Sequence, residues 1–420
     1  MSRVSCFLFL LSLFCGACIS PNRIPPDKIV SINIIDRNGM SEIISSRDRL
    51  DGFEKTDFLS SQPYQKVMRV YGREKNGDVN SRITSYHPNG QVKQYLEATN
   101  NSASGTYQEW FSNGQLKVEA SLVGGVADIN TMAEETWLFD GINRAWDEDG
   151  NLIAEIHYYK GELEGTSFYY HPNGKVWKEI PFEKNKIHGI QKIFLDDGTL
   201  FQTADFNGGL KEGLSIRYWE PSKVACYEQF EKGLLKEGEY FSSEEEVVSE
   251  IKKGKGFRAL FGEKELHQLQ EYQNGIQEGA VKVYDEEQAL AQLYSLKDGE
   301  KNGEEIYYFP GSSQPKLLLN WEGGILNGPV KTWYENGNLE SQREMSQNKK
   351  NGLLTVWYRN GALAFVEEYE SDHLIKGEYY RKGEKAPLSI VEKGRGVASL
   401  FNAEGVFSRK VHYKDGKPVE

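Results

Sequence analysis

The sequence predicts an all-β fold, an elongated antiparallel β-meander of tandem two-strand hairpin repeats that form a single-layer twisted sheet or solenoid. Gly165, Gly189 and Gly213 open three successive segments at intervals of 24 residues. Within these segments Asn-Gly or Asp-Gly recurs between runs rich in aromatic and β-branched residues, which is the pattern of strands joined by hairpin turns. Two glycine-containing turns in every repeat leave no room for a helix.

Each repeat can be aligned on the glycine of its turn dipeptide. An apolar residue follows two positions after this glycine, and another large apolar residue usually follows eight positions after it. Because both offsets are even, the two side chains share one face of a strand. The dipeptides favour two-residue hairpin turns, which require positive φ angles. The expected structural spine is an aromatic residue four positions before the glycine, at Tyr86, Trp110, Trp146, Tyr170, Phe194, Trp333, Trp357 and Phe401.

Two repeats lack the turn glycine. Ser222 and Gln288 occupy its place, while the flanking apolar positions are kept. Packing of the strands, rather than the turn, therefore sets the register of these repeats. We expect them to have the same two-strand structure as the others.

The N-terminal residues 1–17 have the features of a secretory signal peptide, with Arg3, an apolar run and small residues before a cleavage point. The apolar run is too short to span a membrane. Cleavage is expected between Ala17 and Cys18, and the segment resembles a lipobox, in which Cys18 would carry a lipid. Cys15 departs from the leucine usual in a lipobox. The alternative is an ordinary secreted protein cut at the same bond.

Cysteine usage predicts no disulfide framework. The leader removes two of the four cysteines, and Cys18 is the expected lipidation site. Cys226 is then left alone in a predicted strand, where a small buried apolar residue is the simplest interpretation.

The chain before the regular repeats divides into two regions. Residues 18–71 are expected to form a lipid tether and an N-terminal hairpin region, with a polar surface loop at 45–62. Residues 72–140 contain irregular repeats interrupted by an insertion at 125–136.

The remaining chain has the pattern of a duplication. Residues 141–278 form the first half of the repeat array and residues 279–420 the second half. The segment that begins at Gly238 returns at Gly377, 139 residues later. The two halves are therefore expected to have similar local structures.

Composition limits the classes of partner. The chain has 62 acidic and 50 basic residues, and its formal net charge is −12. No basic stripe is visible in the sequence, so nucleic acid is not an expected partner. The acidic excess also argues against electrostatic docking of the whole chain on anionic lipid headgroups.

The repeats resemble a known family. YYHPNGKVWKEIPFEKNKIHG and WYENGNLESQREMSQNKKNG are similar to the MORN-variant repeat of bacterial proteins often labelled YwqK-type, and the likeness covers approximately residues 72–420. The resemblance implies a β-repeat fold and a binding platform or spacer, with no catalytic residue belonging to the repeat itself.

The sequence offers no catalytic, metal or cofactor motif. The seven histidines are scattered over different repeats, and their spacing is not that of a metal site. Neither a phosphate-binding glycine loop nor a nucleophile elbow is present. An enzyme would therefore need a pocket built by residues 45–62 or 125–136, where the array is interrupted.

These observations favour an exported, non-enzymatic protein of the bacterial cell envelope. We expect it to be lipid-anchored at the outer membrane or periplasmic face and to act as a scaffold for protein partners. The alternative is a glycan- or lipid-binding module that uses an exposed aromatic strip. If one face of the sheet is uncovered, that strip would contain the second-position aromatics Phe111, Tyr169, Trp219, Tyr307, Tyr334, Tyr358 and Tyr379.

Overall fold

A computed structural model of the chain describes residues 28–53 and 56–419. The leader, the cleavage site at Ala17 and the lipidation site at Cys18 lie outside these residues, so what the sequence predicts for them stays a prediction. Strand accounts for 64% and helix for 3% of the described residues, which confirms the all-β fold. The chain forms two compact units, one ending at Gly174 and the other beginning at Lys175, and each is described separately.

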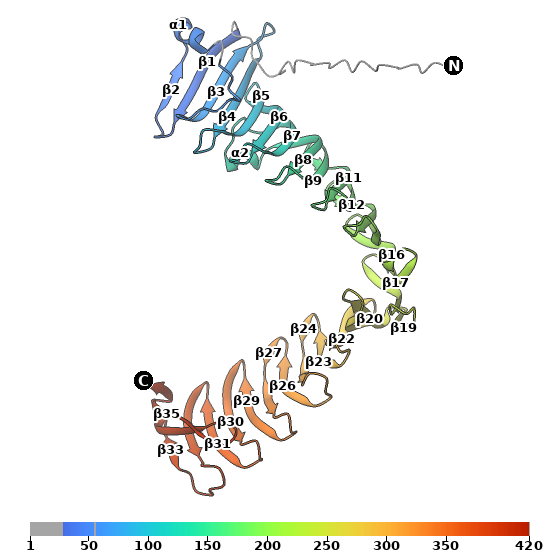
Figure 1. Cartoon of the computed structure of the whole chain (residues 1–420), viewed down its shortest axis with the longest axis vertical. Helices are drawn as coiled ribbons and strands as arrows, with labels where there is room; N and C mark the ends of the chain where they lie inside the picture. The colour runs from blue at the N-terminus through green and yellow to red at the C-terminus, as the bar shows by residue number, and fades with distance from the viewer. Residues whose placement is uncertain (1–27, 54–55, 420) are drawn as a thin grey trace, which may run out of the picture. The chain divides into compact units, whose positions relative to one another are not determined.

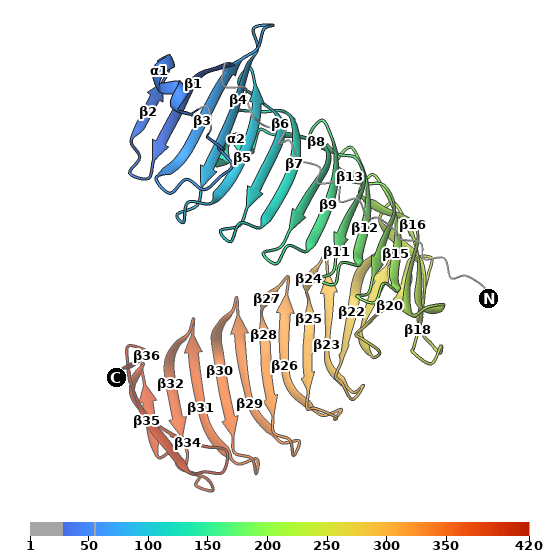
Figure 2. The same cartoon turned by 45° about the horizontal axis from the view of Figure 1, so that its top comes forward.

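The first unit is an antiparallel meander in which neighbouring strands pair in chain order, except that β1 lies between β2 and β3. Figures 1 and 2 show its strands side by side, with a progressive rotation of strand direction along the sheet. Its strands are β1 (Ile29–Asp36), β2 (Ser41–Ile44), β3 (Gln65–Arg73), β4 (Val79–Tyr86), β5 (Val92–Thr99), β6 (Ser102–Trp110), β7 (Leu116–Gly124), β8 (Leu138–Trp146), β9 (Leu152–Tyr159), β10 (Glu162–Leu163) and β11 (Gly165–Tyr170). Its helices are α1 (Arg47–Leu50), η2 (Asp51–Phe53) and α2 (Thr131–Glu134).

One face of this first sheet is covered by the segment at residues 45–62. Leu50 of α1 is buried with Met68 and Val70 of β3, and Phe53 and Phe58 pack against the same cluster. The polar loop predicted from the sequence therefore carries apolar side chains that cap the N-terminal end of the sheet. Such a cap replaces the missing neighbour of a terminal repeat.

The insertion at residues 125–136 covers the opposite face. Ile83 pairs with Arg69, so its side chain points away from Met68 and Val70 on the neighbouring strand. It lies in a second buried cluster with Trp137, which follows the insertion. The Trp137 indole donates a hydrogen bond to a backbone carbonyl of the insertion.

The second unit is also an antiparallel meander in chain order (Figure 2). Each short strand of two residues continues the line of its neighbour, as β13 does for β14 against β12. The strands from the start of the unit are β12 (Val176–Glu183), β13 (Lys186–Ile187), β14 (Gly189–Phe194), β15 (Leu200–Asn207), β16 (Leu210–Glu220), β17 (Lys223–Glu231), β18 (Leu234–Phe241), β19 (Val247–Lys252), β20 (Lys255–Phe261), β21 (Leu266–Gln273), β22 (Ile276–Tyr284) and β23 (Leu290–Lys297). They are followed by β24 (Glu300–Lys301), β25 (Gly303–Tyr308), β26 (Pro315–Glu322), β27 (Ile325–Leu326), β28 (Gly328–Trp333), β29 (Leu339–Ser346), β30 (Lys349–Trp357), β31 (Leu363–Glu370), β32 (His373–Tyr379), β33 (Ser389–Glu392), β34 (Arg395–Phe401), β35 (Phe407–Lys414) and β36 (Lys417–Val419).

The turn that carries Asn-Gly or Asp-Gly is wider than the sequence predicts. Between β14 and β15, Leu195 N donates to Thr199 O and Gly198 N donates to Leu195 O, which leaves three residues in the turn. Only the glycine has a positive φ, +87° at Gly198. The prediction of two-residue turns at these dipeptides is therefore wrong, and we call them wide turns. A bulge accompanies the wide turn, between Ile193 and Phe194.

Two-residue turns occur at the other edge of the sheet, between one wide-turn hairpin and the next. Lys184 and Asn185 have φ angles of 48° and 65°, as in a type I′ turn. In most of these tight turns the second residue also donates its N–H to the preceding hairpin. Gly209 N, for example, lies 2.9 Å from Ile187 O, and Gly233 N lies 2.8 Å from Lys211 O.

Cross-strand register assigns the side chains to two faces. Ser215 pairs with Glu228 and Ile216 pairs with Tyr227, so the first pair defines face A and the second pair defines face B. The centre of face A is buried, with Ser215 and Glu228 each 2% exposed. Exposed apolar side chains such as that of Tyr227 lie on face B.

Glycines on face A allow aromatic rings to lie flat on the sheet. A Cβ atom at Gly238 would stand 2.7 Å from the hydroxyl oxygen of Tyr240, and one at Gly377 would stand 2.6 Å from that of Tyr379. Both tyrosines are completely buried. The same local arrangement thus occurs at the two positions that the sequence relates by a 139-residue repeat.

Glycine is missing from two wide turns whose backbone still has a positive φ. Glu245 has φ +66° and Gln288 has φ +63°, a conformation that is unfavourable for an L-residue. We expect Glu245→Gly to raise the free energy of unfolding by about 0.5–1 kcal/mol, because the relieved strain exceeds the entropy that glycine loses.

The matched variant Gln288→Gly should give no comparable gain. The Gln288 amide donates hydrogen bonds to Leu266 O at 3.2 Å and Asp285 O at 3.3 Å, and glycine removes both. Chemical denaturation of the two variants checks this expectation. Equal stabilisation by both variants would show that backbone strain alone governs these turns.

Candidate interaction surfaces

The eight predicted spine aromatics lie beside the wide turns. Where the structure gives the cross-strand partner of a spine aromatic, that partner is the apolar residue predicted two positions after the turn glycine. Trp110 pairs in this way with Leu116, and Trp333 with Leu339. Tyr86 is buried, and its hydroxyl donates to Phe58 O in the N-terminal cap at 2.8 Å. The other seven are half-buried, at Trp110, Trp146, Tyr170, Phe194, Trp333, Trp357 and Phe401.

In some repeats an aromatic side chain next to the wide turn connects successive repeats. Tyr334 and Tyr358 donate their hydroxyl hydrogens to Trp357 O at 2.8 Å and Tyr380 O at 2.6 Å. Trp219 donates its indole hydrogen to Phe241 O at 3.1 Å. Each acceptor is 22 or 23 residues further along the chain. These side chains therefore satisfy backbone groups of the next repeat.

The predicted strip of second-position aromatics is consequently not exposed. Tyr334, Tyr358 and Tyr379 are buried, and the other four residues of that set, Phe111, Tyr169, Trp219 and Tyr307, are half-buried. For Trp219, Tyr334 and Tyr358, the bond to the next repeat gives the ring a structural role.

Face A buries charged side chains that sequence analysis did not single out. The Glu228 carboxylate accepts hydrogen bonds from Arg258 at 2.6 and 3.1 Å and from the Tyr240 hydroxyl at 3.0 Å. Burial alone would lower the pKa of Arg258, but the adjacent Glu228 carboxylate raises it above its usual range. The pKa of Tyr240 is raised by burial and by the same carboxylate. The group is a satisfied internal ion pair.

A second buried carboxylate on face A is Glu305, whose side chain is fully buried. It accepts hydrogen bonds from Lys301 at 2.5 Å, the Tyr307 hydroxyl at 3.0 Å and the Trp321 indole at 2.7 Å. The Lys301 ammonium also lies 4.9 Å from the centre of the Tyr294 ring. Burial alone would raise the pKa of Glu305, but hydrogen bonds from Lys301, Tyr307 and Trp321 hold it below its usual value.

Face B exposes an apolar patch over β14–β17. Ile190, Leu214 and Tyr227 are 55%, 45% and 39% exposed, and Ile216 lies beside them, paired with Tyr227. We call these four residues the face-B patch. Trp177 is a further exposed apolar side chain on the same face. Apolar groups gathered on one uncovered face are typical of an interaction surface.

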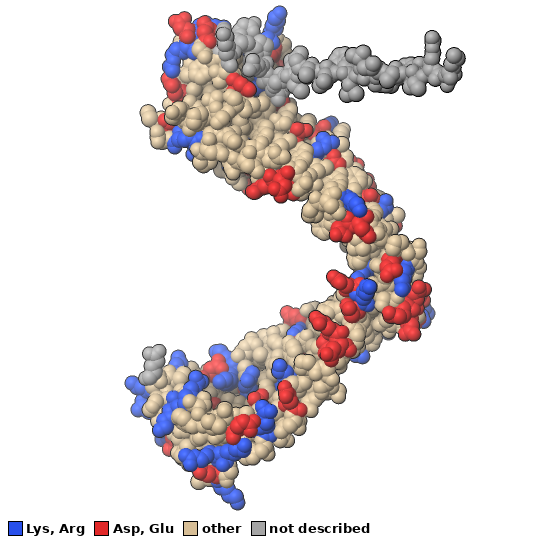
Figure 3. Space-filling model, viewed as in Figure 1, with Lys and Arg blue, Asp and Glu red and all other residues tan. Residues whose placement is uncertain are grey.

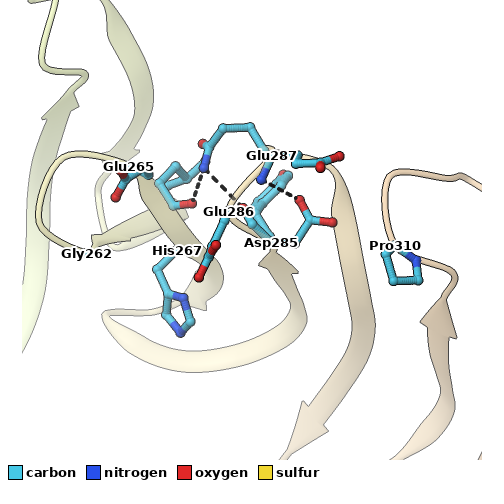
Figure 4. A pocket seen from close by; sticks show the side chains of 10 residues that line it. Gly262, Glu265, His267, Asp285, Glu286, Glu287 and Pro310 are labelled. Carbon is cyan, nitrogen blue, oxygen red and sulfur yellow. Dashed lines mark hydrogen bonds between the residues drawn. The ribbon is translucent and has the colours of Figure 1, made fainter.

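An acidic hollow of about 560 Å³ lies at the wide turn between β22 and β23. Figure 4 shows Glu265, Asp285, Glu286 and Glu287 around it, with His267 on the adjoining strand. Glu287 N donates to Asp285 Oδ1 at 3.0 Å, so one carboxylate is used to close the turn. The remaining carboxylates give the hollow a negative lining.

Two similar hollows lie at other wide turns. One of about 560 Å³ is lined by Leu200 and Tyr218, and another of about 360 Å³ by Leu317 and Trp333. Each is bounded by an apolar residue of one repeat and an aromatic residue of the next. These hollows are open features of the wide-turn edge.

The interruptions of the array were the predicted places for a catalytic pocket. A hollow of about 250 Å³ lies beside the 45–62 segment, lined by Leu59, Ser61 and Trp110. Its lining contains no acid, base or nucleophile pair suited to catalysis. Across residues 28–53 and 56–419, no group of three or more His, Cys, Asp or Glu side chains could hold a metal ion. Nor does this part of the chain contain a helix long and apolar enough to cross a membrane.

Comparison with known families supports the repeat assignment. The sequence matches the MORN repeat variant over residues 103–123, 139–160, 163–184 and 326–347. Each matched segment contains most or all of the two strands that flank a wide turn, such as β6 and β7 or β28 and β29. The chain is therefore similar to MORN-variant proteins at four separate hairpins.

Comparison with whole proteins adds little. No curated protein matches the sequence. Among solved structures, a porin-like protein from Bacteroides uniformis ATCC 8492 aligns with 58% of this chain and 95% of its own chain, at 9% identity and a TM-score of 0.16. A likeness at this TM-score carries no argument about fold or function.

The Glu305 cluster predicts a pH-dependent stability. Folding lowers the pKa of Glu305, so the unfolded chain binds a proton at this carboxylate more readily than the folded chain does. The contribution of Glu305 to the free energy of unfolding is therefore fully present above the ordinary carboxyl pKa. It is lost as the pH falls through the lower pKa of the folded state. We expect Glu305→Gln to lower the free energy of unfolding at pH 7 by about 2 kcal/mol and to flatten its decline below pH 4.5.

The neighbouring Glu304 provides a matched control, because it is exposed. Glu304→Gln should leave the free energy of unfolding at pH 7, and its decline below pH 4.5, nearly unchanged. Denaturant titrations of the two variants at pH 7 and pH 3.5 measure the difference. Equal losses in the two variants would contradict the role assigned to the buried carboxylate.

Proposed function

We propose that this chain is an exported protein of the bacterial cell envelope, related to the YwqK-type lipoproteins, that is held by a lipid at Cys18. Its β-array acts as a non-enzymatic scaffold that binds a protein partner. The leader pattern of residues 1–17 and the MORN-variant matches support the proposal. The observation that carries it is the contrast between the two faces of the second unit.

At the centre of its strands, face A offers little exposed surface to a partner. Tyr240, Glu228 and Glu305 are buried there, and both carboxylates are paired within the sheet. Face B instead presents apolar side chains beside charged ones, as Tyr227 pairs with Glu239 across the strands. Such a mixture of aromatic and aliphatic anchors with polar neighbours suits a protein–protein interface.

A photo-crosslinking amino acid placed at Tyr227 or Leu214 should trap the partner in native envelopes. Leu195 is the matched control, because it is 40% exposed against 39% for Tyr227 but lies in a wide turn. We expect a defined protein adduct from the two face-B positions and none from Leu195. Mass spectrometry of the adducts identifies the partner.

Adducts of equal yield from all three positions would indicate random collisions and would remove the basis of the face-B proposal. The double variant Leu214→Lys/Tyr227→Lys provides a second, independent test of the face-B contact. It should lower co-purification of the trapped partner at least tenfold while leaving the melting temperature within a few degrees, because both side chains are already exposed.

A glycan- or lipid-binding module is the second candidate. The hollows beside Tyr218 and Trp333 favour it, because an aromatic ring bounds each one and the flat face of a sugar packs well on such a ring. Retention of the purified chain on cell-wall fragments, lost in Trp333→Ala and accompanied by no protein adduct, would replace the first candidate with this one.

Lipidation has a direct test in the mass of the protein extracted from native membranes. We expect a mature species that starts at Cys18 and carries the added mass of acyl chains. Cys18→Ala should abolish both the added mass and the membrane association, while a cytosolic reporter is unaffected. A wild-type species cut after Ala17 without added mass would instead identify an ordinary secreted protein.

A further inference from the structure

The last strands of the second unit differ in charge from the rest of the chain. Residues 376–420 contain ten basic and six acidic side chains, whereas residues 175–375 contain 24 basic and 34 acidic ones. Figure 3 shows Lys and Arg gathered over the strands near the C-terminus. A positive region on a chain of net charge −12 is a local feature that the total charge conceals.

Most cations of this region are available to a partner. Arg395 pairs with Asp415 at 2.9 Å. Within the described part of the chain, no ion pair involves the exposed side chains of Lys393, Arg409, Lys410, Lys414 and Lys417. Arg409 and Lys410 are neighbours on β35 and point to opposite faces of the sheet, so we call Lys393, Lys410, Lys414 and Lys417 the C-terminal basic surface.

Apolar side chains adjoin the basic ones. Val406 and Phe407 are 62% and 53% exposed at the last wide turn, and Val419 is 44% exposed on β36. The N-terminal end of the first unit, in contrast, is covered by the apolar residues of the 45–62 segment. Exposed apolar groups beside cations suit a contact with another surface.

Continuation of the sheet by another strand is not the use of this surface. Lys414 and Lys417 face each other at the edge, and Pro418 lacks the N–H that a further strand would need. Charged side chains and proline are the usual means of preventing edge-to-edge pairing. The partner must therefore dock through side chains.

A complementary surface exists in the same unit. Three successive turns on the same edge of the sheet, after β18, β20 and β22, carry the carboxylates of Glu244, Glu245, Glu246, Glu263, Glu265, Asp285, Glu286 and Glu287. Among the described residues none of these carboxylates takes part in an ion pair. We call them the acidic turns.

The two surfaces cannot neutralise each other within one chain. Eight strand lines, from β25 to β33, separate the acidic turns from β34, which amounts to on the order of 40 Å along the sheet at about 4.8 Å per strand. This exceeds the Debye length of about 8 Å at physiological ionic strength. The attraction is thus available only between molecules.

We propose that the C-terminal basic surface of one molecule docks on the acidic turns of a second copy of the same chain. An anionic membrane is a poorer occupant, because Glu378, Glu392 and Glu404 are interspersed among the cations and the preceding strands are strongly acidic. The contact joins two different surfaces, so it is heterologous and can repeat from molecule to molecule. This assembly goes beyond the binding of a protein partner on face B.

Charge reversal on each surface tests the proposal. Lys410→Glu/Lys414→Glu/Lys417→Glu reverses the basic surface, and Glu245→Lys/Glu263→Lys/Glu286→Lys reverses one residue in each acidic turn. By sedimentation velocity in 20 mM salt, the wild type should show a mass that grows with protein concentration and returns to that of the monomer in 0.5 M salt. Each triple variant alone should remain monomeric, and an equimolar mixture of the two should associate.

The triple variant Lys66→Glu/Lys75→Glu/Lys93→Glu is the control, because it changes net charge equally at exposed lysines of the first unit. It should associate like the wild type, and circular dichroism should be the same for all variants. A wild type that stays monomeric in 20 mM salt, or a mixture that fails to associate, overturns the proposal. Loss of binding to phosphatidylglycerol vesicles in the lysine-reversed variant, with wild-type self-association unchanged, would assign the surface to a membrane instead.

Discussion

Every repeat of this chain depends on its neighbour for the hydrogen bonds of its backbone. A pair of strands has two edges with unpaired N–H and C=O groups, and a thin sheet has no second layer to cover its aromatic side chains. The chain solves both problems with the next repeat along. Strand pairing satisfies most of the backbone, and in several repeats a side chain beside the wide turn reaches a carbonyl 22 or 23 residues away, as Tyr334 does at Trp357. The period of the sequence is therefore a consequence of contacts between repeats rather than within them.

The sequence predicts the strands well because each repeat places the same residue types at the same offsets. The positions of Tyr86 and Trp110 beside their turns follow from that pattern. The hydrogen-bond acceptors of Tyr334, Tyr358 and Trp219 could not be predicted. They are backbone carbonyls, which every residue has, so the sequence does not indicate which one is used. Turn width could not be predicted either, because Asn-Gly suits both turn types and the bulge beside the wide turn, as between Ile193 and Phe194, has no signal in the sequence.

The buried carboxylates could not be predicted from the sequence either. Glu228 and Glu305 look like any of the 62 acidic residues until the register places them on face A, opposite Arg258 or beside Trp321. The segments at 45–62 and 125–136 were recognisable as interruptions, but the face that each one covers depends on the pairing of Ile83 with Arg69. The basic excess after residue 375 can be counted in the sequence, but the exposure of those cations and of the acidic turns depends on the fold.

The tight turns give the second unit a mechanical property. Because most of these turns are bonded to the hairpin before them, as Gly233 is to Lys211, a pulling force on the C-terminus would load one hairpin at a time and leave the others intact. Each hairpin that yields would lengthen the chain by on the order of 80 Å, for 24 residues at about 3.4 Å each. A tether built in this way would lengthen in steps under tension and shorten again when the tension ceases, since each released hairpin has a folded neighbour on which to re-form.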